Sequence, residues 1–343
     1  MPDFQNASIE TPLLKNNHAV VVPLFNERET LPHLISRLKE LYSSLQTMPC
    51  AQPQELHFIL VDDGSTDGSG EFLQTLPNDT ADLISSIHFS RNFGHQAAIT
   101  AGIRFAVDQG FETVSVIDAD LQDPPELILD FIRNYQDGFD VVYGLRQHRD
   151  GETWFKLLTA KVFYRLMRRL THVDIPVDAG DFRLLSQRAA RAFLSMPEKH
   201  RFVRGMVAWI GFSQKALPYH RASRQFGSTH YPFRKMLKFA FDGITSFSAI
   251  PLQLATYLGF VAAVVGLLVL CWSLYARFIT GDTVQAWTSL MTVVLFFGAV
   301  QLMCLGVIGE YLARIYDESR QRPLFVVKNV RSVWADRPSK KSV

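Results

Sequence analysis

Acidic side chains follow three apolar segments of this chain, in a pattern that could bind a cation or the polar groups of a ligand. They occur in VPLFNE (22–27), VDDGSTDGSG (61–70) and DADLQDPPE (118–126). Because like charges repel, carboxylates that come together in this way weaken a fold unless something cationic lies between them. The pattern therefore indicates a binding site rather than a stabilising feature.

The third acidic cluster has the residue types of a divalent metal site. Asp118 and Asp120 form a D-x-D pair with Gln122 two residues further on, and oxygen ligands of this kind suit Mg²⁺ or Mn²⁺. Mg²⁺ seldom sits in a cage made only of protein and prefers one or two carboxylates together with substrate phosphates. A D-x-D pair also occurs in solvated turns, so its position at the end of a buried strand decides between the two interpretations. We predict a metal site that also takes a phosphate-containing ligand.

The elements that must position these residues alternate along the chain. Short apolar runs are found at 18–25, 56–61, 83–90, 113–117 and 140–144, and segments suited to helices at 29–45, 95–108 and 124–135. Nearly continuous runs of Val and Ile are typical of strands buried on both faces of a parallel sheet. The alternation predicts an α/β fold with a mostly parallel sheet and with ligands at the carboxyl ends of its strands. We expect the Pro-Pro-Glu of the last segment to form the first turn of its helix.

Composition excludes several classes of protein. A chain of 343 residues with 48% hydrophobic side chains corresponds to about two structural units. The net charge of +2 gives no electrostatic reason to expect a nucleic-acid partner. Cys50, Cys271 and Cys304 have neither the number nor the spacing of a disulfide framework or a structural zinc site.

Two long stretches near the C-terminus predict membrane spans. Residues 243–276 and 283–309 contain no Asp, Glu, Lys or Arg. A bilayer core needs about 20 apolar residues in a helix, and both stretches exceed that length. We predict spans at 254–276 and 287–309 that form a hairpin, the alternative being two buried core helices.

Basic residues predict the orientation of the hairpin. They follow the second span (314–331) and precede the first (234–238), whereas the link between the spans offers only Arg277. By the positive-inside rule, both chain ends and the large N-terminal part are cytoplasmic. Residues 1–17 lack the pattern of a cleaved signal peptide. The expected division is a tail at 1–17, an α/β domain at 18–232, a juxtamembrane helix at 233–250, a transmembrane hairpin at 251–310 and a cytoplasmic tail at 311–343.

The motifs together resemble a known family. PLFNE (23–27), VDDGSTDGS (61–69), SRNFGHQAA (90–98), DADLQDPPE (118–126), YGLR (143–146), GDFRLLS (180–186) and RFVRG (201–205) are similar to those of family 2 glycosyltransferases of the GT-A fold. Within that family they resemble the polyprenyl-phosphate branch, which includes dolichol-phosphate mannose synthases, bactoprenol glucosyltransferases and undecaprenyl-phosphate aminoarabinose transferases. The resemblance extends from about residue 19 to 327, through GEYLARIY (309–316) and QRPLF (321–325).

The resemblance implies roles for the strand-end residues. The donor-binding residues would be Pro23, Phe25, Glu27 and Asp62, which hold the nucleoside, and Asp118, Asp120 and Gln122, which bind nucleotide and metal. Arg146 would add a fixed positive charge near the diphosphate, or else form a surface ion pair. Asp62 can accept a hydrogen bond from a base N–H or a ribose hydroxyl, while Phe25 offers a flat face. The alternative is that Asp62 and Asp63 cap the helix that follows them.

The lipid acceptor would bind elsewhere. Arg201, Arg204, Arg224 and Ser228 are candidates for its phosphate, because guanidinium groups match phosphate oxygens. Basic residues near a membrane also bind anionic headgroups in general, so the assignment of any single arginine stays open. Residues 152–170 form a basic amphipathic pattern that either lies in the membrane interface or packs on the sheet.

Asp181 is the usual candidate for a catalytic base in this branch. A phosphate acceptor has a second pKa of about 6 and is mostly a dianion near neutral pH, so it needs little help in losing a proton. Asp181 therefore either acts as a base or orients the acceptor.

The expected function is the inverting transfer of one sugar, with UDP-glucose favoured, to undecaprenyl phosphate or a similar lipid at the cytoplasmic membrane, for modification of cell-envelope glycans. A processive polysaccharide synthase is an alternative, but it would need a QxxRW-type motif and more spans. An inactive scaffold is another, and the intact DADLQ and VDDGS motifs argue against it. Two spans leave much lipid-facing surface, which favours a homo-oligomer.

Overall fold

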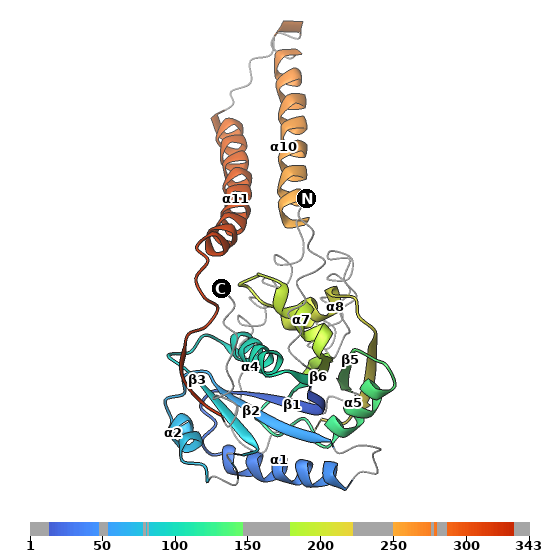
Figure 1. Ribbon diagram of the computed structural model, residues 1–343. Helices are drawn as coiled ribbons and strands as arrows, with labels where there is room; N and C mark the ends of the chain where they lie inside the picture. The colour runs from blue at the N-terminus through green and yellow to red at the C-terminus, as the bar shows by residue number, and fades with distance from the viewer. Residues whose placement is uncertain are drawn as a thin grey trace, which may run out of the picture. The chain divides into compact units, whose positions relative to one another are not determined.

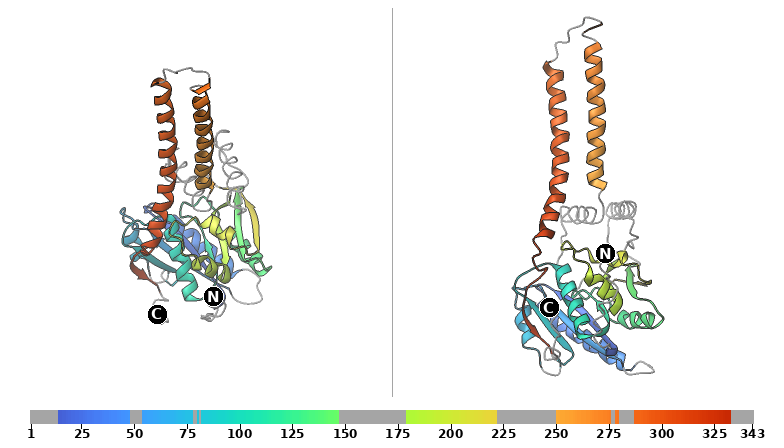
Figure 2. Two further views of the ribbon diagram at one scale, coloured as in Figure 1. Left: turned by 90° about the horizontal axis from the view of Figure 1, so that it is seen from above. Right: turned by 45° about the horizontal axis from the view of Figure 1, so that its top comes forward.

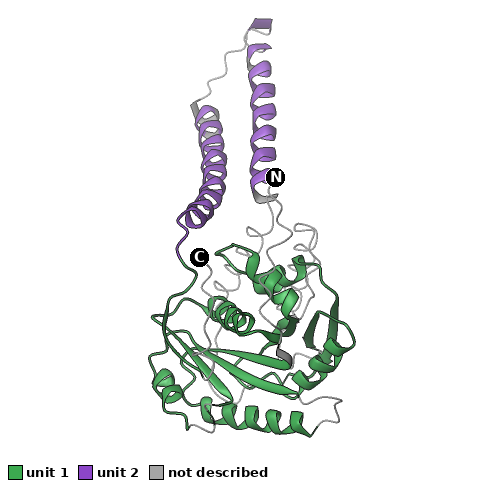
Figure 3. Cartoon of the chain, viewed as in Figure 1, with its two compact units in different colours: residues 1–165, 173–230, 323–343 green, residues 166–172, 231–322 purple. Residues whose placement is uncertain are grey.

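The computed structural model describes residues 14–47, 54–77, 80, 82–146, 179–221, 250–275, 278–279 and 287–332. The chain divides into two compact units, which Figure 3 colours separately. The first comprises residues 1–165, 173–230 and 323–343, and the second residues 166–172 and 231–322. The first unit contains the predicted α/β domain, and the second contains the predicted hairpin.

Eight strands of the described residues form one sheet in the order β7-β5-β6-β4-β1-β2-β3-β8. The strands are β1 (Leu14–Leu24), β2 (Glu55–Asp62), β3 (Ile84–Phe89), β4 (Phe111–Val116), β5 (Val141–Arg146), β6 (Ala179–Ser186), β7 (Gln214–Tyr219) and β8 (Val327–Arg331). Neighbours pair in parallel except at β6 and β8, which run antiparallel to theirs. The mostly parallel sheet and the five predicted strands are thereby confirmed.

The central strand β1 is buried on both faces because its side chains alternate between two layers of helix. Val20 and Val22 belong to the apolar core under α1 (Leu31–Gln46). Val21 faces α4 (His95–Gln109), where a Cβ on Gly102 would lie only 2.2 Å from its Cγ1. Figure 1 shows α1 and α4 on opposite faces of the sheet. This sandwich fixes the strand ends that carry the acidic clusters.

Within the described part of the first unit there are four shorter helices: α2 (Ser69–Gln74), α5 (Leu127–Gln136), α7 (Gln187–Ser195) and α8 (Val203–Trp209). The prediction that Pro-Pro-Glu forms the first α-helical turn needs correction, since α5 begins one residue after it. Leu127 N donates to Pro124 O and Ile128 N to Pro125 O. These bonds between residues three apart make a tighter turn that leads into the helix.

The segment after the hairpin also differs from the prediction. Residues 311–343 were expected to form a tail, but β8 joins the sheet as an edge strand antiparallel to β3. Ser90 N donates to Val326 O at 3.0 Å, and the rings of Phe89 and Phe325 stack with centroids 5.1 Å apart. An edge strand leaves most of its side chains exposed, so it lacks the apolar run by which buried strands are recognised.

Among its described residues, the second unit has two helices, α10 (Ile250–Tyr275) and α11 (Trp287–Ser319), that are long and apolar enough to cross a membrane. They run side by side in both views of Figure 2. Large apolar side chains such as Phe260 and Leu295 are 70% exposed, as expected for helices surrounded by lipid. Helix α11 continues to Ser319, beyond the predicted span. Residues 152–170 and 233–249, predicted as amphipathic and juxtamembrane helices, lie outside the described residues.

Candidate active site

The three acidic clusters meet at one edge of the sheet. Strands β4, β1 and β2 are parallel neighbours, so their carboxyl ends lie together. Leu24 pairs with Asp62 across β1 and β2, and Ile117 N donates to Val21 O at 3.0 Å. The segments that follow these strands carry Phe25 and Glu27, Asp62 and Asp63, and Asp118 and Asp120.

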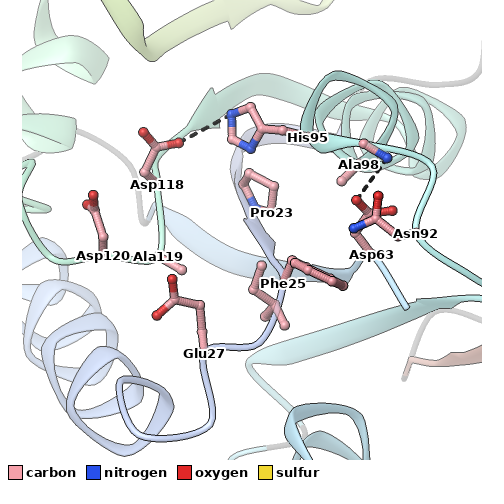
Figure 4. A pocket seen from close by; sticks show the side chains of 12 residues that line it. Pro23, Phe25, Glu27, Asp63, Asn92, His95, Ala98, Asp118, Ala119 and Asp120 are labelled. Carbon is pink, nitrogen blue, oxygen red and sulfur yellow. Dashed lines mark hydrogen bonds and ion pairs between the residues drawn. The ribbon is translucent and has the colours of Figure 1, made fainter. Parts of the chain in front are cut away.

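A cavity of about 360 Å³, which we call the first cavity, opens between these segments. Five predicted site residues line it: Pro23, Phe25, Glu27, Asp118 and Asp120. Figure 4 shows the carboxylates of Glu27, Asp118 and Asp120 on one side, and Asp63 and Asn92 on the other. The carboxylates can bind the phosphate groups of a ligand through a cation, and the aromatic ring of Phe25 offers the same ligand a flat face.

A second cavity of about 430 Å³ adjoins the first and shares Phe25 and Asn92 with it. Asp62 lines this second cavity and is not part of the first. Arg91, from the loop after β3, and Lys328, from β8, also line it. The predicted nucleoside-binding residues therefore divide between two adjacent cavities, with Phe25 common to both.

Hydrogen bonds between loops hold Phe25 and Glu27 in place. Asn26 has a left-handed backbone with φ of 56°, and its Oδ1 accepts from Thr66 N at 2.9 Å. Glu27 N donates to Ser69 Oγ at 3.1 Å. The loop after β1 is thus pinned to the loop after β2, which explains why NE and DGSTDGS occur together in this sequence.

Asp62 is buried and ionised. Its Oδ1 accepts from Ser65 N at 2.9 Å, and His88 Nδ1 lies 3.2 Å from its Oδ2. Burial by itself would raise the pKa of Asp62, but the hydrogen bonds from His88 and Ser65 outweigh it and hold the pKa below its usual value. A Cβ on Gly70 would lie 2.7 Å from Oδ2, so this carboxylate needs a glycine beside it. The surroundings prepare Asp62 to accept a further hydrogen bond.

Asp63 has a structural role in the loop that precedes α4. Its two carboxylate oxygens accept from Phe93 N at 2.6 Å and Gly94 N at 2.9 Å, immediately before α4. Burial raises its pKa, with the two backbone hydrogen bonds opposing that effect. The alternative that Asp62 and Asp63 cap the helix that follows them is wrong, because neither α2 nor α4 has a side-chain hydrogen bond at its N-cap, and Asp63 instead binds the loop before α4.

The D-x-D residues have the surroundings that a cation requires. Asp118 Oδ1 is buried and accepts no hydrogen bond from the described residues. Burial raises the pKa of Asp118 to about 6; His95 opposes this, and neighbouring carboxylates add to it. Asp120 Oδ1 accepts from Gln122 N at 3.1 Å, across Leu121 with φ of 57°. A divalent cation beside Asp118 and Asp120 would offset the repulsion between these neighbouring carboxylates.

Within the described residues, no three His, Cys, Asp or Glu side chains lie close enough together to hold a metal by themselves. Such a site fits a cation that takes its remaining ligands from phosphate oxygens, from Gln122 or from water.

His95 connects the first cavity to Asp181. At the start of α4, its Nε2 lies 3.5 Å from Asp118 Oδ1 and 3.4 Å from Asp181 Oδ2. Arg204 donates to both oxygens of Asp181, at 2.9 and 3.2 Å. Burial would raise the pKa of Asp181, but Arg204 and then His95 hold it well below its usual value. Asp181 is therefore an ionised, firmly held carboxylate and a weak base.

Arg146 belongs to a network around the carboxylate of Asp123. Asp123 is fully buried and accepts a hydrogen bond from Tyr219 OH. Arg146 Nε donates to Tyr219 OH at 3.3 Å, and Arg221 Nε lies 3.2 Å from Asp123 Oδ1. Arg221 Nη2 is also 3.6 Å from Asp120 Oδ2. Arg146 does not line the first cavity, whereas Arg221 contacts Asp120 and His95 contacts Asp118.

Two of the four predicted acceptor residues, Arg201 and Arg204, lie in the described part of the chain, and they bind different partners. Arg201 precedes α8, where its guanidinium donates to Met196 O and Glu198 O. Helix α8 begins at Val203, so Arg204 lies in it and Arg201 does not. Arg224 and Ser228 lie outside the described residues.

The sequence did not predict a function for several residues of the site. His95 and Asn92 lie in SRNFGHQAA, a motif that was recognised without roles for its members. Asp123 was part of DADLQDPPE, but its partner Tyr219 comes from β7, 96 residues away. A spacing of this size is not visible in a local pattern, so only the pairing of β5 with β7 reveals it.

Comparison with known proteins places the chain in a sequence family. Residues 19–194 match the model for glycosyl transferase family 2, and residues 250–315 match the GtrB C-terminal hairpin. An uncharacterized glycosyltransferase, YkcC of Bacillus subtilis, is 45% identical over 91% of this chain and 93% of its own length. A bactoprenol glucosyl transferase of Shigella phage SfV is 34% identical over 91% and 98%. A prophage bactoprenol glucosyl transferase homolog of Escherichia coli is 34% identical over 91% and 99%.

Proposed function

Since the chain belongs to glycosyltransferase family 2, we propose that it transfers one sugar from a nucleotide-sugar to a polyprenyl phosphate at the cytoplasmic face of a membrane. The observation that carries the proposal is the pairing, in one chain, of a carboxylate-lined cavity at the strand ends with an apolar helical hairpin. Relatives named as bactoprenol glucosyl transferases match both parts over 91% of this chain. Those names favour UDP-glucose as donor and undecaprenyl phosphate as acceptor.

The reaction we propose is a single displacement. An oxygen of the acceptor phosphate forms a bond to the anomeric carbon, and the bond from that carbon to the donor diphosphate breaks. The nucleoside diphosphate leaves with the electron pair of the broken bond, and the configuration at the anomeric carbon is inverted. A Mg²⁺ or Mn²⁺ ion, when bound, would neutralise charge on the diphosphate.

The protein residues position the reacting groups and supply charge. Asp118 and Asp120, together with Gln122, are the candidate ligands of the cation. Arg146 and Arg221 both contact the buried Asp123, and Arg221 also contacts Asp120, so the two guanidinium groups add positive charge on that side. Fixed charges of this kind stabilise charge that develops during a reaction.

Asp181 is proposed as an orienting group rather than a base. Arg204 and His95 bind its carboxylate, and its low pKa makes it a poor proton acceptor. The acceptor phosphate is mostly a dianion near neutral pH and can attack without losing a proton. Through His95, Asp181 also influences where Asp118 lies.

We also propose that the hairpin spans the cytoplasmic membrane twice, with both chain ends on the cytoplasmic side. Basic residues flank the two helices on that side, and a cytosolic nucleotide-sugar requires the catalytic domain there. Nothing in the described residues bears on a homo-oligomer, which stays a prediction from the exposed apolar helices.

Release of nucleoside diphosphate tests the proposal. Purified full-length protein is incubated with Mg²⁺ or Mn²⁺ and one of UDP-glucose, UDP-galactose, GDP-mannose or a UDP-pentose, with and without a short polyprenyl phosphate. We expect release with one donor and only when the lipid is present. Release that does not depend on the lipid, or none with any donor, would contradict the proposal.

A further inference from the structure

We propose that Lys328, which comes from β8 and lines the second cavity, takes part in recognising the base of the donor nucleotide. The inference rests on the proposed function, since it assumes a nucleotide donor. It goes further by giving the strand that follows the membrane hairpin a part in donor recognition.

The two cavities lie next to each other, as sites for the diphosphate and the base of one nucleotide must. The first contains Asp118 and Asp120, the candidate partners of a metal-bound diphosphate. The second adjoins it along Phe25 and Asn92. A ligand with its diphosphate at the D-x-D pair can therefore extend past Phe25 into the second cavity, whose volume of about 430 Å³ is in the usual range of small-molecule sites.

The second cavity offers both a hydrogen-bond acceptor and a cationic donor. Asp62 is held as a carboxylate by Ser65 and His88 and can accept from a ring N–H. Lys328 also lines the cavity, and its ammonium group can donate to a ring carbonyl. Uracil and guanine each present an N–H beside a carbonyl, whereas adenine has no carbonyl. The pair therefore favours uracil or guanine over adenine.

The backbone of β8 is fixed on both sides of Lys328. Phe325 stacks on Phe89, and Val327 pairs with that same residue of β3. On the other side, Arg331 donates to the carbonyl oxygens of Leu73, Gln74 and Leu76 at 3.2, 2.6 and 2.8 Å. These contacts hold the strand against the sheet at the cavity wall.

The pairing of β3 with β8 has a register shift at Lys328. Phe89 pairs with Val327, but His88, one residue earlier, pairs with Asn329. Lys328 is thus the extra residue of a bulge. Bulges are frequent beside active sites, where they change the direction of a side chain. Asn329 is exposed on the same strand and does not line the cavity, so it provides a matched control.

The test measures binding of UDP, GDP, ADP and pyrophosphate to the full-length protein by calorimetry with Mg²⁺ present. For the better-bound of UDP and GDP, Lys328→Ala should lower affinity about threefold to tenfold, the loss of one charge-assisted hydrogen bond at a partly solvated site. Pyrophosphate affinity should not change, because it has no base. Lys328→Arg should keep most of the affinity, and Asn329→Ala all of it. ADP should bind most weakly of the three nucleotides.

Three results would overturn the assignment of Lys328. They are unchanged nucleotide affinity in Lys328→Ala, an equal loss of pyrophosphate and nucleotide affinity, and binding of ADP as tight as that of UDP and GDP. A wild-type protein that binds none of the three nucleotides would instead overturn the proposed function itself. Thermal unfolding of each variant shows whether its fold is intact.

Discussion

The carboxylates of the site differ in what they are free to bind. Asp63 and Asp181 use both of their oxygens on protein groups, the former on backbone N–H groups and the latter on Arg204 and His95. Asp118 and Asp120 line the first cavity, and a buried oxygen of Asp118 accepts no hydrogen bond from the described residues, although His95 Nε2 lies 3.5 Å from it. The same residue type thus serves two purposes, which the surrounding donors determine.

Replacing one carboxylate of the D-x-D pair tests the metal assignment. Asp120→Asn should lower turnover on the order of a hundredfold, because an amide cannot supply the charge that a cation needs beside a departing diphosphate. Asp130→Asn on the exposed side of α5 should leave turnover unchanged. The measurement is acceptor-dependent turnover with Mg²⁺ or Mn²⁺ added. Full turnover in excess chelator would show that no metal is used.

Arg204 provides a second test, because its planar fork binds Asp181. Arg204→Lys should lose one of the two hydrogen bonds and lower acceptor-dependent turnover about tenfold, while nucleotide affinity stays the same. Arg188→Lys is a matched control, since Arg188 forms a similar two-pronged contact with Asp140 away from both cavities.

Nucleotide affinity and turnover are measured on the same preparations of these two variants. An equal fall in nucleotide affinity in Arg204→Lys would mean that Arg204 serves the donor diphosphate instead of the acceptor side.

At the scale of elements, the sheet positions the site through strands that contain buried histidines. His57 on β2 stacks against Phe111 on β4 with centroids 5.8 Å apart, and its Nε2 lies 2.8 Å from Ser85 Oγ on β3. Burial lowers the pKa of His57 to about 4. The strands are therefore held together around an imidazole that stays neutral.

This burial predicts a pH dependence of stability. Between pH 6.5 and about 4 the unfolded chain binds a proton at His57 and the folded protein does not, so the free energy of unfolding falls as pH falls. The loss is about 1.4 kcal/mol per pH unit for this residue. His57→Gln should reduce the difference in unfolding free energy between pH 6 and pH 5 by about that amount.

Denaturant unfolding of the full-length protein in detergent at the two pH values gives this difference. His33→Gln, at an exposed position of α1, should leave it unchanged. An unaltered difference in His57→Gln would show that the imidazole is protonated in the folded protein.

Elements differed in how far the sequence revealed them. Strands β1 to β5 are apolar runs buried between helices, and their carboxyl ends could be predicted together with the acidic residues that follow. Strand β6 contains the buried charged residues Asp181 and Arg183 among apolar residues, and these two residues hide it from a search for apolar runs. Strand β8 lies at an exposed edge.

The residues of the site also differed in how far the sequence revealed them. Asp62, Asp118 and Asp120 could be found because each follows its own strand. His95 beside Asp181, and Tyr219 beside Asp123, depend on contacts between distant segments that only the assembled sheet brings together.

At the scale of the whole molecule, the covalent link between a family 2 domain and an apolar hairpin suits an acceptor that cannot leave the bilayer. A polyprenyl phosphate exposes only its headgroup to the cytosol. A soluble domain would meet that headgroup only by collision, whereas a domain attached to the membrane stays close to it. The need to stay close to the headgroup accounts for the presence of both units in one chain.

Labelling of intact cells tests the orientation of the hairpin. In a variant without native cysteines, Asp282→Cys between the two spans should react with an impermeant maleimide added outside. Glu198→Cys in the first unit should react only after the cells are opened, and tags at residues 1 and 343 should be shielded in the same way. Labelling of Glu198→Cys from outside would contradict the use of a cytosolic donor.

The central claim is that this chain makes a polyprenyl-phosphate sugar, and the mass of the lipid product tests it most directly. Purified full-length protein is incubated with a divalent cation, a short polyprenyl phosphate and the donor that gives nucleotide release, and the extracted lipid is analysed by mass spectrometry. We expect a single new lipid, heavier than the acceptor by one sugar residue and absent with Asp120→Asn. A ladder of lipids with several sugars, a sugar attached through a diphosphate, or unchanged lipid alongside nucleotide release would contradict the claim.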